Sequence, residues 1–344
     1  MTRKQTKRWN MILENEINEK AVQEAAAMLQ QGKIIAFPTE TVYGLGADAT
    51  DEKAVEKIFQ VKGRPQDNPL IAHVATKDQL QQLTSSYPHY VDNLIEQFTP
   101  GPITFVLPSN GVCAKNVTAG LDTIGIRIPN HPVARQLLKE VNLPLAAPSA
   151  NLSGKPSPTT ADHVWEDLNG KIEGLMDAGP TGVGVESTVI DCTQSIPMIL
   201  RPGGITKDQL EHVVGEVLTD SALMDQSNQP KSPGMKYKHY SPEVPLILVE
   251  GGTLTLQRYI DSAKRENKRV GVLASTRKIE QLTADEVINL GENMNEVASH
   301  LYDGLRTFKR GQVDIIFCEA FDKKGIGVAV MNRLEKAATD YIKE

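Results

Sequence analysis

The loop formed by residues 38–46 (PTETVYGLG) concentrates hydroxyl groups and glycines directly after an apolar run. That run, residues 34–37 (IIAF), predicts a strand that enters the interior. Pro38 ends the strand because proline cannot donate to the ladder, and the glycines let a ligand approach the backbone closely. Since α/β folds place ligands at strand ends, the stretch predicts a binding loop at the edge of a sheet.

Two further motifs supply groups that bind anions. Lys62 and Arg64 lie in a glycine-containing turn after a predicted helix, and arginine offers a planar fork that matches a carboxylate or a phosphate. Ser149 and Asn151 bracket a turn after an apolar strand. Each motif alone has an ordinary alternative, an exposed surface turn for the first and a local side-chain turn for the second. Together with the hydroxyl-rich loop, they predict an anion pocket.

Several polar side chains stand within or beside predicted apolar strands. Arg127 lies in the run 124–129 (IGIRIP), where a buried arginine requires either a structural ion pair or a ligand carboxylate. His73 lies in another such run, where a histidine is more often a hydrogen-bonded core residue than a catalytic group. Arg201 ends a third strand, and Ser187 stands with a threonine at the start of a fourth. These positions make all four residues candidates for the site.

Several common catalytic motifs are absent from the sequence. It contains no P-loop, no His-Glu-x-x-His and no Gly-x-Ser-x-Gly, and residues 153–156 (SGKP) carry proline where a P-loop has serine or threonine. The three cysteines, Cys113, Cys192 and Cys318, are widely spaced, which disfavours a disulfide framework and a zinc site. The sequence therefore predicts reduced thiols, no covalent catalysis and no metal site built from protein side chains.

The overall composition is typical of a globular protein in water. The chain has 344 residues, of which 40% are hydrophobic and 23% charged, and this length suggests two domains. A net charge of −6 argues against a general polyanion binder, and an aromatic content of 5% argues against a stacking platform for single strands. We see no signal peptide and no run long enough to span a membrane, so the sequence predicts a cytoplasmic protein without membrane contact.

Two patterns of secondary structure follow one another along the chain. Up to about residue 215, strands outnumber helices, which favours a mixed sheet. Helices are predicted at 19–31 and 52–61, and strands at 33–37, 70–75, 103–107, 123–128, 145–147, 185–191 and 199–201. From residue 245, strands and helices alternate as in a small doubly wound domain. These strands are predicted at 245–249, 269–274, 286–290 and 313–319, and these helices at 254–265, 293–309 and 328–342.

The segment between the two patterns reads as a linker. Residues 219–233 are rich in Ser, Asp, Gln, Asn and Pro and show no period. The linker closes with residues 233–242 (PGMKYKHYSP), which concentrate lysines with tyrosine and histidine rings. A passive tether has little need of such residues, so we interpret 232–242 as a lid over the site.

Taken together, the motifs resemble those of a known family. The loop 38–45, the Lys62-x-Arg64 pair, the Ser149-x-Asn151 turn and residues 186–188 (EST) resemble the YrdC-like domain. The segment 232–240 (SPGMKYKHY) and the C-terminal α/β module resemble the two-domain Sua5 branch, the threonylcarbamoyl-AMP synthases. The resemblance covers about residues 15–344, and lysine at position 238 is the one departure at the motif sites.

The resemblance implies the fold. It predicts an α/β protein with a YrdC-like catalytic domain over residues 1–215, built as a twisted mixed sheet flanked by helices. A linker or lid follows over 216–243, and a smaller Rossmann-like α/β Sua5 domain over 244–344.

It also implies the activity. L-threonine, bicarbonate or CO₂, and ATP would give threonylcarbamoyl-AMP, diphosphate and water, a nucleotidyltransferase reaction with Mg²⁺ bound to the nucleotide. The product would pass to the machinery that transfers the threonylcarbamoyl group to tRNA. The family's threonine site falls on Thr41, His73, Arg127, Ala147 and Ser187, and its ATP site on Arg64, Asn68, Thr123, Ser149, Ser157, Arg201 and Tyr240. The catalytic motifs fall on Lys62, Arg64, Ser149 and Asn151.

Two alternatives to this enzyme stay open at this point. One is a binding module whose basic concave face holds double-stranded RNA, and weak RNA binding is also compatible with the enzyme. The other is a carbamoyl-adenylate enzyme of hydrogenase maturation, against which the absence of Cys-x-x-Cys fingers counts. No general base stands out, and we expect His73 to position substrate rather than transfer a proton.

Overall fold

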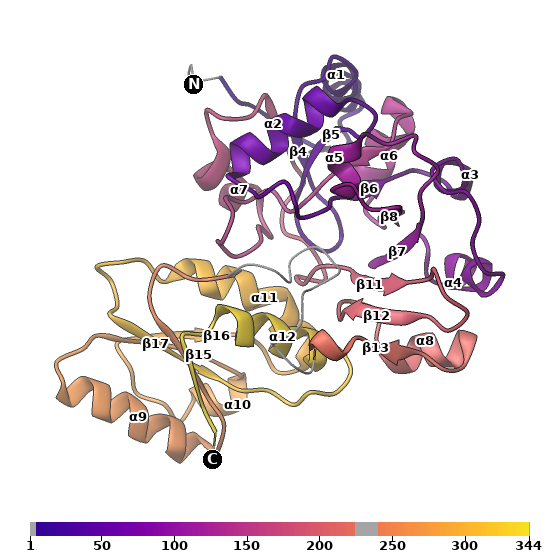
Figure 1. Cartoon of the computed structure of the whole chain (residues 1–344). Coiled ribbons are helices and arrows are strands. Elements are labelled where there is room, and N and C mark those ends of the chain that lie inside the picture. Colours follow the sequence, from indigo (N-terminus) through magenta and orange to yellow (C-terminus); the bar gives the residue numbers. More distant parts are fainter. Residues whose placement is uncertain (1–4, 224–239, 344) are drawn as a thin grey trace. The chain divides into compact units, whose positions relative to one another are not determined.

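The computed structural model describes residues 5–223 and 240–343 (Figure 1). Within these ranges the chain divides into two compact units. The second unit comprises Gly154–Ser157, Val183–Val185 and residues 240–343, and the first unit comprises the rest. The predicted boundaries at residues 215 and 243 stay a prediction, and most of the predicted lid lies outside the described residues.

The first unit is built on one eleven-stranded sheet with the order β1-β10-β4-β5-β9-β6-β8-β7-β11-β12-β13. Parallel and antiparallel pairs alternate irregularly across it, so the predicted mixed sheet is confirmed. The strands are β1 (Lys7–Asn10), β4 (Ile35–Phe37), β5 (Gly44–Asp48), β6 (Ile71–His73), β7 (Ile103–Pro108), β8 (Thr123–Arg127), β9 (Leu145–Ala146), β10 (Gly174–Asp177), β11 (Thr188–Asp191), β12 (Met198–Arg201) and β13 (Leu218–Thr219), and a separate hairpin joins β2 (Ile12–Leu13) to β3 (Glu16–Ile17).

The binding loop is shorter than predicted. Its last residues belong to β5, because the backbone of Gly44–Asp48 pairs with β4 on one side and with β9 on the other. The loop proper therefore runs only from residue 38 to residue 43, between two neighbouring antiparallel strands.

Helices cover both faces of this sheet. The apolar sides of α1 and α6 pack in one core with Phe37 and Leu145, whereas α2, α4, α7 and α8 pack in another with Ile126. Each buried Leu, Ile or Phe contributes about 1.5–3 kcal/mol to these cores. The helices are α1 (Glu19–Gln30), α2 (Glu52–Lys62), α3 (Lys77–Gln81), α4 (Tyr90–Phe98), α5 (Lys115–Thr118), α6 (Pro132–Val141), α7 (Ala161–Leu168) and α8 (Lys207–Val214), followed by the short η1 (Ser221–Leu223).

The second unit contains a parallel five-stranded sheet with the order β16-β15-β17-β14-β18. Helix α9 covers one face, and α11 and α12 cover the other, as the predicted doubly wound pattern requires (Figure 1). The elements are β14 (Leu246–Val249), α9 (Thr253–Arg265), β15 (Val270–Ala274), α10 (Thr276–Ile279), β16 (Glu286–Asn289), α11 (Met294–Thr307), β17 (Ile315–Glu319), α12 (Gly327–Ala337) and β18 (Asp340–Ile342).

The prediction of a helix over 328–342 is wrong at its end. Helix α12 stops at Ala337, and Ala338 is extended, with ψ of 144°. The amide of Thr339 then donates to the carbonyl of Leu246 (2.7 Å), which starts the parallel pairing of β18 with β14. Residues 340–342 thus form a strand because they pair with the free edge of β14.

No helix within the described ranges is long and apolar enough to cross a membrane.

Candidate active site

Arg127 is the last residue of β8 and forms the centre of the candidate site. Its side chain is 5% exposed, and its Nη1 donates to Oγ1 of Thr41 (2.9 Å). Its Nη2 also forms an ion pair with Oε1 of Glu40 (2.7 Å). The predicted arginine in an apolar strand is therefore buried, and it contacts the binding loop through two consecutive residues.

The binding loop is held in place by its own threonines. Oγ1 of Thr39 accepts from the amides of Thr41 and Val42 (both 3.2 Å) and donates to the carbonyl of Val42 (2.6 Å). Thr39 and Thr41 are 2% and 0% exposed, and their hydroxyl oxygens lie 2.9 Å apart. This local turn, of the kind that Ser and Thr favour, fixes the hydroxyl of Thr41 beside the guanidinium.

His73 ends β6, the strand next to β8, and the register of the two strands pairs it with Arg127. Burial and, second, the positive charge of Arg127 lower the pKa of His73 to about 3. Its Nδ1 lies 3.3 Å from the carbonyl of Ile71, and its ring stands edge-on to Phe37. A neutral, buried imidazole of this kind supports positioning rather than proton transfer.

Ser187 lies on the other side of the arginine strand. Its hydroxyl is 2.8 Å from Oγ1 of Thr104 on β7, and β7 pairs antiparallel with β8. Arg201, at the end of β12, donates to the carbonyl of Ser187 through Nε (3.2 Å) and Nη2 (3.0 Å). The backbone of Gly203 packs so closely on this segment that a Cβ there would meet the amide nitrogen of Thr188 at 2.2 Å. The end of β6, the end of β8, the loop after β4 and the start of β11 thus bring His73, Arg127, Thr41 and Ser187 into one region of the first unit.

Lys62 is the last residue of α2, which ends with Gly63 in the left-handed conformation (φ 61°). Its side chain is buried, so the alternative of an exposed turn does not apply to it. Nζ donates to the carbonyls of Ser149 and Asn151, both at 2.5 Å. The hydroxyl of Ser149 in turn donates to Oδ1 of Asn151 (2.5 Å). Hydrogen bonds therefore join the two predicted anion motifs into one network, the Lys62 network, which consists of Lys62, Ser149 and Asn151.

Arg64 lies just beyond this helix and is half-buried. Its guanidinium donates to the carbonyls of Asn68 (3.4 Å) and Pro69 (3.2 Å). Asn68 is 3% exposed, and its Nδ2 is buried without a hydrogen-bond partner. Because a buried amide donor normally has a partner, this nitrogen is suited to a ligand oxygen.

Other predicted site residues lie elsewhere. Thr123 begins β8 and Arg127 ends it, which separates them by about 13 Å at about 3.3 Å per residue. Ser157 and Tyr240 belong to the second unit, where the ring of Tyr240 stacks on Tyr302 with centroids 5.4 Å apart. Ala147 follows β9, and its amide donates to the carbonyl of Ile71 (2.9 Å).

Three residues of this region are absent from the sequence-based set. Glu40 pairs with Arg127, Thr104 contacts Ser187, and His131 carries a buried Nδ1 without a hydrogen-bond partner. Burial lowers the pKa of His131, and the negative charge of Glu40 acts in the opposite direction. The sequence contained one signal for Glu40, an acidic residue between two threonines of the binding loop.

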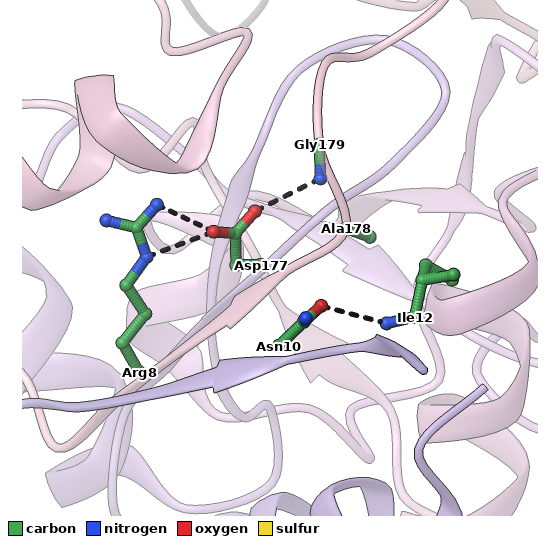
Figure 2. A pocket seen from close by; sticks show the side chains of 6 residues that line it. All are labelled: Arg8, Asn10, Ile12, Asp177, Ala178 and Gly179. Atoms are coloured by element: carbon green, nitrogen blue, oxygen red, sulfur yellow. Dashed lines mark hydrogen bonds and ion pairs between the residues drawn. The ribbon is translucent and has the colours of Figure 1, made fainter. Parts of the chain in front are cut away.

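A surface pocket of about 570 Å³ lies apart from these residues, beyond the ends of β1 and β10 (Figure 2). Its polar groups satisfy one another: Asp177 accepts from Nη2 of Arg8 (2.6 Å) and from the amide of Gly179 (3.1 Å). None of the predicted site residues lines it. The hydroxyl of Tyr43 in the binding loop donates to the carbonyl of Gly179 (2.7 Å) and accepts from the amide of Ala178 (3.2 Å), and both bonds tie up groups at the rim of the pocket. The pocket is therefore not the candidate site.

Two family models match the chain. One, described as telomere recombination, matches residues 27–203, and one described as the C-terminal domain of threonylcarbamoyl-AMP synthase matches residues 205–339. The threonylcarbamoyl-AMP synthase of Bacillus subtilis is 49% identical over 338 residues, which cover 97% of this chain and 98% of the relative. That of Pyrococcus abyssi is 48% identical over 327 residues, covering 94% and 95%.

A solved structure agrees with these relatives. Sua5 of P. abyssi in complex with L-threonine is 44% identical, covers 99% of both chains and gives a TM-score of 0.91. Fold and sequence together define a protein of the class that joins a YrdC-like domain to a Sua5 domain. The chain belongs to the threonylcarbamoyl-AMP synthase family. The predictions of fold class and family are confirmed.

Proposed function

We propose that this protein is an L-threonylcarbamoyladenylate synthase. It converts L-threonine, bicarbonate and ATP into threonylcarbamoyl-AMP, diphosphate and water, and with CO₂ in place of bicarbonate no water is formed. The observation that carries the proposal is the buried guanidinium of Arg127, bonded to the binding loop. It lies in a chain that matches a threonine-bound Sua5 over 99% of its length.

Threonine is held at the arginine. Arg127 binds the carboxylate, because a guanidinium fork matches a carboxylate with two parallel hydrogen bonds. Thr41 and Ser187 offer hydroxyls beside it, and both are fully buried. His73 presents a neutral ring, and Ala147 contributes its backbone. These groups orient the amino acid without a protein nucleophile.

ATP is held by the Lys62 network and the residues beside it. Arg64 and the unpartnered Nδ2 of Asn68 face the nucleotide, and Ser149 and Asn151 shape the turn that Lys62 fixes. We assign Thr123, Ser157, Arg201 and Tyr240 to the same substrate on the basis of family resemblance. Mg²⁺ enters with the nucleotide, as the family resemblance implies.

The chemistry requires positioning above all. The threonine amine in its neutral form attacks CO₂ and releases a proton to solvent, which gives a carbamate, and a carbamate oxygen then attacks the α-phosphorus of ATP in line. The bond between the α-phosphorus and the bridging oxygen breaks, and diphosphate leaves. The protein must hold two anions close together and neutralise charge on the leaving group, which its buried cations and hydroxyls can do.

We place the enzyme in the cytoplasm, in accordance with its three buried, unpaired cysteines. Its product would pass to the machinery that transfers the threonylcarbamoyl group to tRNA. A simple module for double-stranded RNA is a poorer interpretation, because a guanidinium as buried as that of Arg127 cannot reach an RNA backbone. The carbamoyl-adenylate enzyme of hydrogenase maturation has less support, since two relatives that cover 97% and 94% of the chain bear the name threonylcarbamoyl-AMP synthase.

Release of diphosphate from ATP tests the proposal. We expect release only when L-threonine and bicarbonate are both present, together with a product that has the mass of threonylcarbamoyl-AMP. Release that does not depend on threonine, or no release at all, would contradict the proposed function.

A further inference from the structure

We propose that Glu40 and Arg127 together form a receptor for an amino-acid zwitterion, in which Arg127 binds the α-carboxylate and Glu40 binds the α-ammonium. This inference rests on the proposed function. It assigns to Glu40 the recognition of the amine, the group of threonine that has to react.

The hydrogen bonding of this pair is incomplete. Nη2 of Arg127 lies 2.7 Å from Oε1 of Glu40, and the two side chains are 5% and 13% exposed. Nη1 of Arg127 is used by Thr41. Nε and Nη2 of Arg127 and both carboxylate oxygens of Glu40 are nevertheless buried without a well-directed hydrogen bond. Beside the ion pair, Nε of Arg127 is therefore an unused donor and Oε2 of Glu40 an unused acceptor.

Such a pair is unstable without further partners. Removing a carboxylate from water is costly unless hydrogen bonds replace its hydration, and a single close cation only partly does so. A zwitterion supplies what is lacking. Its ammonium carries three N–H donors for the glutamate, and its carboxylate accepts from the free edge of the guanidinium.

The charges also balance. Arg127 and Glu40 together are neutral, as is a zwitterion, so the complex leaves no buried charge without an opposite one. Arg127 alone would bind the carboxylate and leave the ammonium without a counter-ion. His73 does not alter this sum, because burial and the charge of Arg127 keep its ring neutral. Burial also lowers the pKa of His131 near Glu40, against the opposing effect of the negative charge of Glu40.

A simpler role for Glu40 makes the opposite prediction. If the carboxylate only shields Arg127 until a substrate arrives, it competes with the carboxylate of threonine. Its removal should then tighten threonine binding. If Glu40 receives the ammonium, its removal should weaken threonine and spare ligands that have no amine. The two roles therefore differ in the sign of one measured change.

Calorimetric titration with two ligands separates these roles. L-threonine is compared with 3-hydroxybutanoate, which keeps the carboxylate and the hydroxyl and lacks the amine. We expect Glu40→Gln to weaken threonine binding at least about tenfold and to leave 3-hydroxybutanoate unchanged or tighter, since a lost charge-assisted contact typically costs more than 1.4 kcal/mol. Glu56→Gln, on the exposed side of α2, serves as the matched control and should change neither affinity.

The outcomes are distinct. Equal weakening of both ligands, or threonine binding that is unchanged or tighter, overturns the inference. If Glu40→Gln does not fold, the wild-type protein still decides: it should bind threonine at least about tenfold more tightly than 3-hydroxybutanoate, and equal affinity overturns the inference. Diphosphate release by the wild-type protein that is independent of threonine would overturn the proposed function itself.

Discussion

Arg127 combines deep burial with contacts to two consecutive residues of the binding loop. We expect Arg127→Ala to weaken threonine binding by about 2–5 kcal/mol, the usual cost of removing one partner of a buried, hydrogen-bonded charge pair. Part of this loss comes from Glu40, which would keep its charge without a cation. Calorimetry measures the affinity, and Arg277→Ala on the exposed side of α10 is the control. A folded Arg127→Ala protein with unchanged threonine affinity would rule out the assignment.

His73 should make stability depend on pH. Its pKa is lowered to about 3 in the native protein, whereas the unfolded chain titrates near pH 6.5. Between these values the unfolded state binds more protons than the native state. The contribution of the neutral His73 to the free energy of unfolding is therefore fully present above about pH 6.5, and it falls by about 1.4 kcal/mol per pH unit below that pH. We expect His73→Asn to reduce this slope in urea unfolding between about pH 7 and pH 4. Equal slopes for both proteins would contradict the burial of a neutral ring.

The sequence predicted several of the polar residues that the structure brings together around Arg127, and it missed Glu40, which forms an ion pair with that arginine. Arg127 and His73 were predicted because polar residues within apolar strands are unusual and demand an explanation. Glu40 offered no such contrast, since an acidic residue in a polar loop is normally exposed. The folded sheet brings the loop after β4 to the end of β8, where Glu40 meets Arg127, and the two strands are far apart in the sequence.

The end of α2 joins two motifs through Lys62. Replacing it by Met would remove the donor for the carbonyls of Ser149 and Asn151. We expect Lys62→Met to lower the free energy of unfolding by about 1–3 kcal/mol, the cost of leaving buried polar groups without partners. Lys53→Met, exposed on the same helix, is the control for urea unfolding. If both variants are as stable as the wild-type protein, Lys62 does not fix the turn.

Arg64, two residues further on, should act on the reaction rather than on the fold. It is half-buried, and its contacts to the carbonyls of Asn68 and Pro69 are long. Charge on the triphosphate grows at the leaving group, so we expect Arg64→Ala to lower turnover by about 10²–10³-fold, the range for loss of one transition-state donor. Threonine affinity should stay the same. Normal ATP binding together with a normal rate would show that Arg64 has no part in the site.

Elements were predicted best where local pattern and packing agree. The helices at 52–61 and 254–265 match α2 and α9 within a residue or two, because each has an apolar face and clear ends. Strands β5 and β18 were missed, since β5 begins with glycines and β18 is a short edge strand. Both exist because a neighbouring strand offers an unpaired edge, and a single-sequence pattern does not contain that information.

The second unit includes two short segments from the middle of the chain. Arg306 on α11 donates to the carbonyl of Pro156 through Nε (3.1 Å) and Nη2 (2.6 Å). The amide of Ser241 donates to the carbonyl of Gly154 (2.9 Å). Sequence reasoning divides a chain at contiguous boundaries, so this assignment could not be predicted from composition or motifs.

Gly184 provides the test of this arrangement. Its φ is +79°, and a Cβ there would lie 2.3 Å from the carbonyl oxygen of Ala298 and from Cα of Ser299 on α11. Gly184→Ala therefore combines an unfavourable backbone conformation with a clash against backbone atoms that cannot rotate away. We expect it to lower the free energy of unfolding by about 2–5 kcal/mol.

Gly182→Ala is the matched control, because a Cβ at Gly182 would have no neighbour within 4 Å. The control should stay within about 0.5 kcal/mol of the wild-type protein. Urea unfolding compares the three proteins, and limited proteolysis should cut residues 183–185 faster in Gly184→Ala alone. If both variants are as stable and as resistant as the wild-type protein, the segment does not pack against α11 in solution.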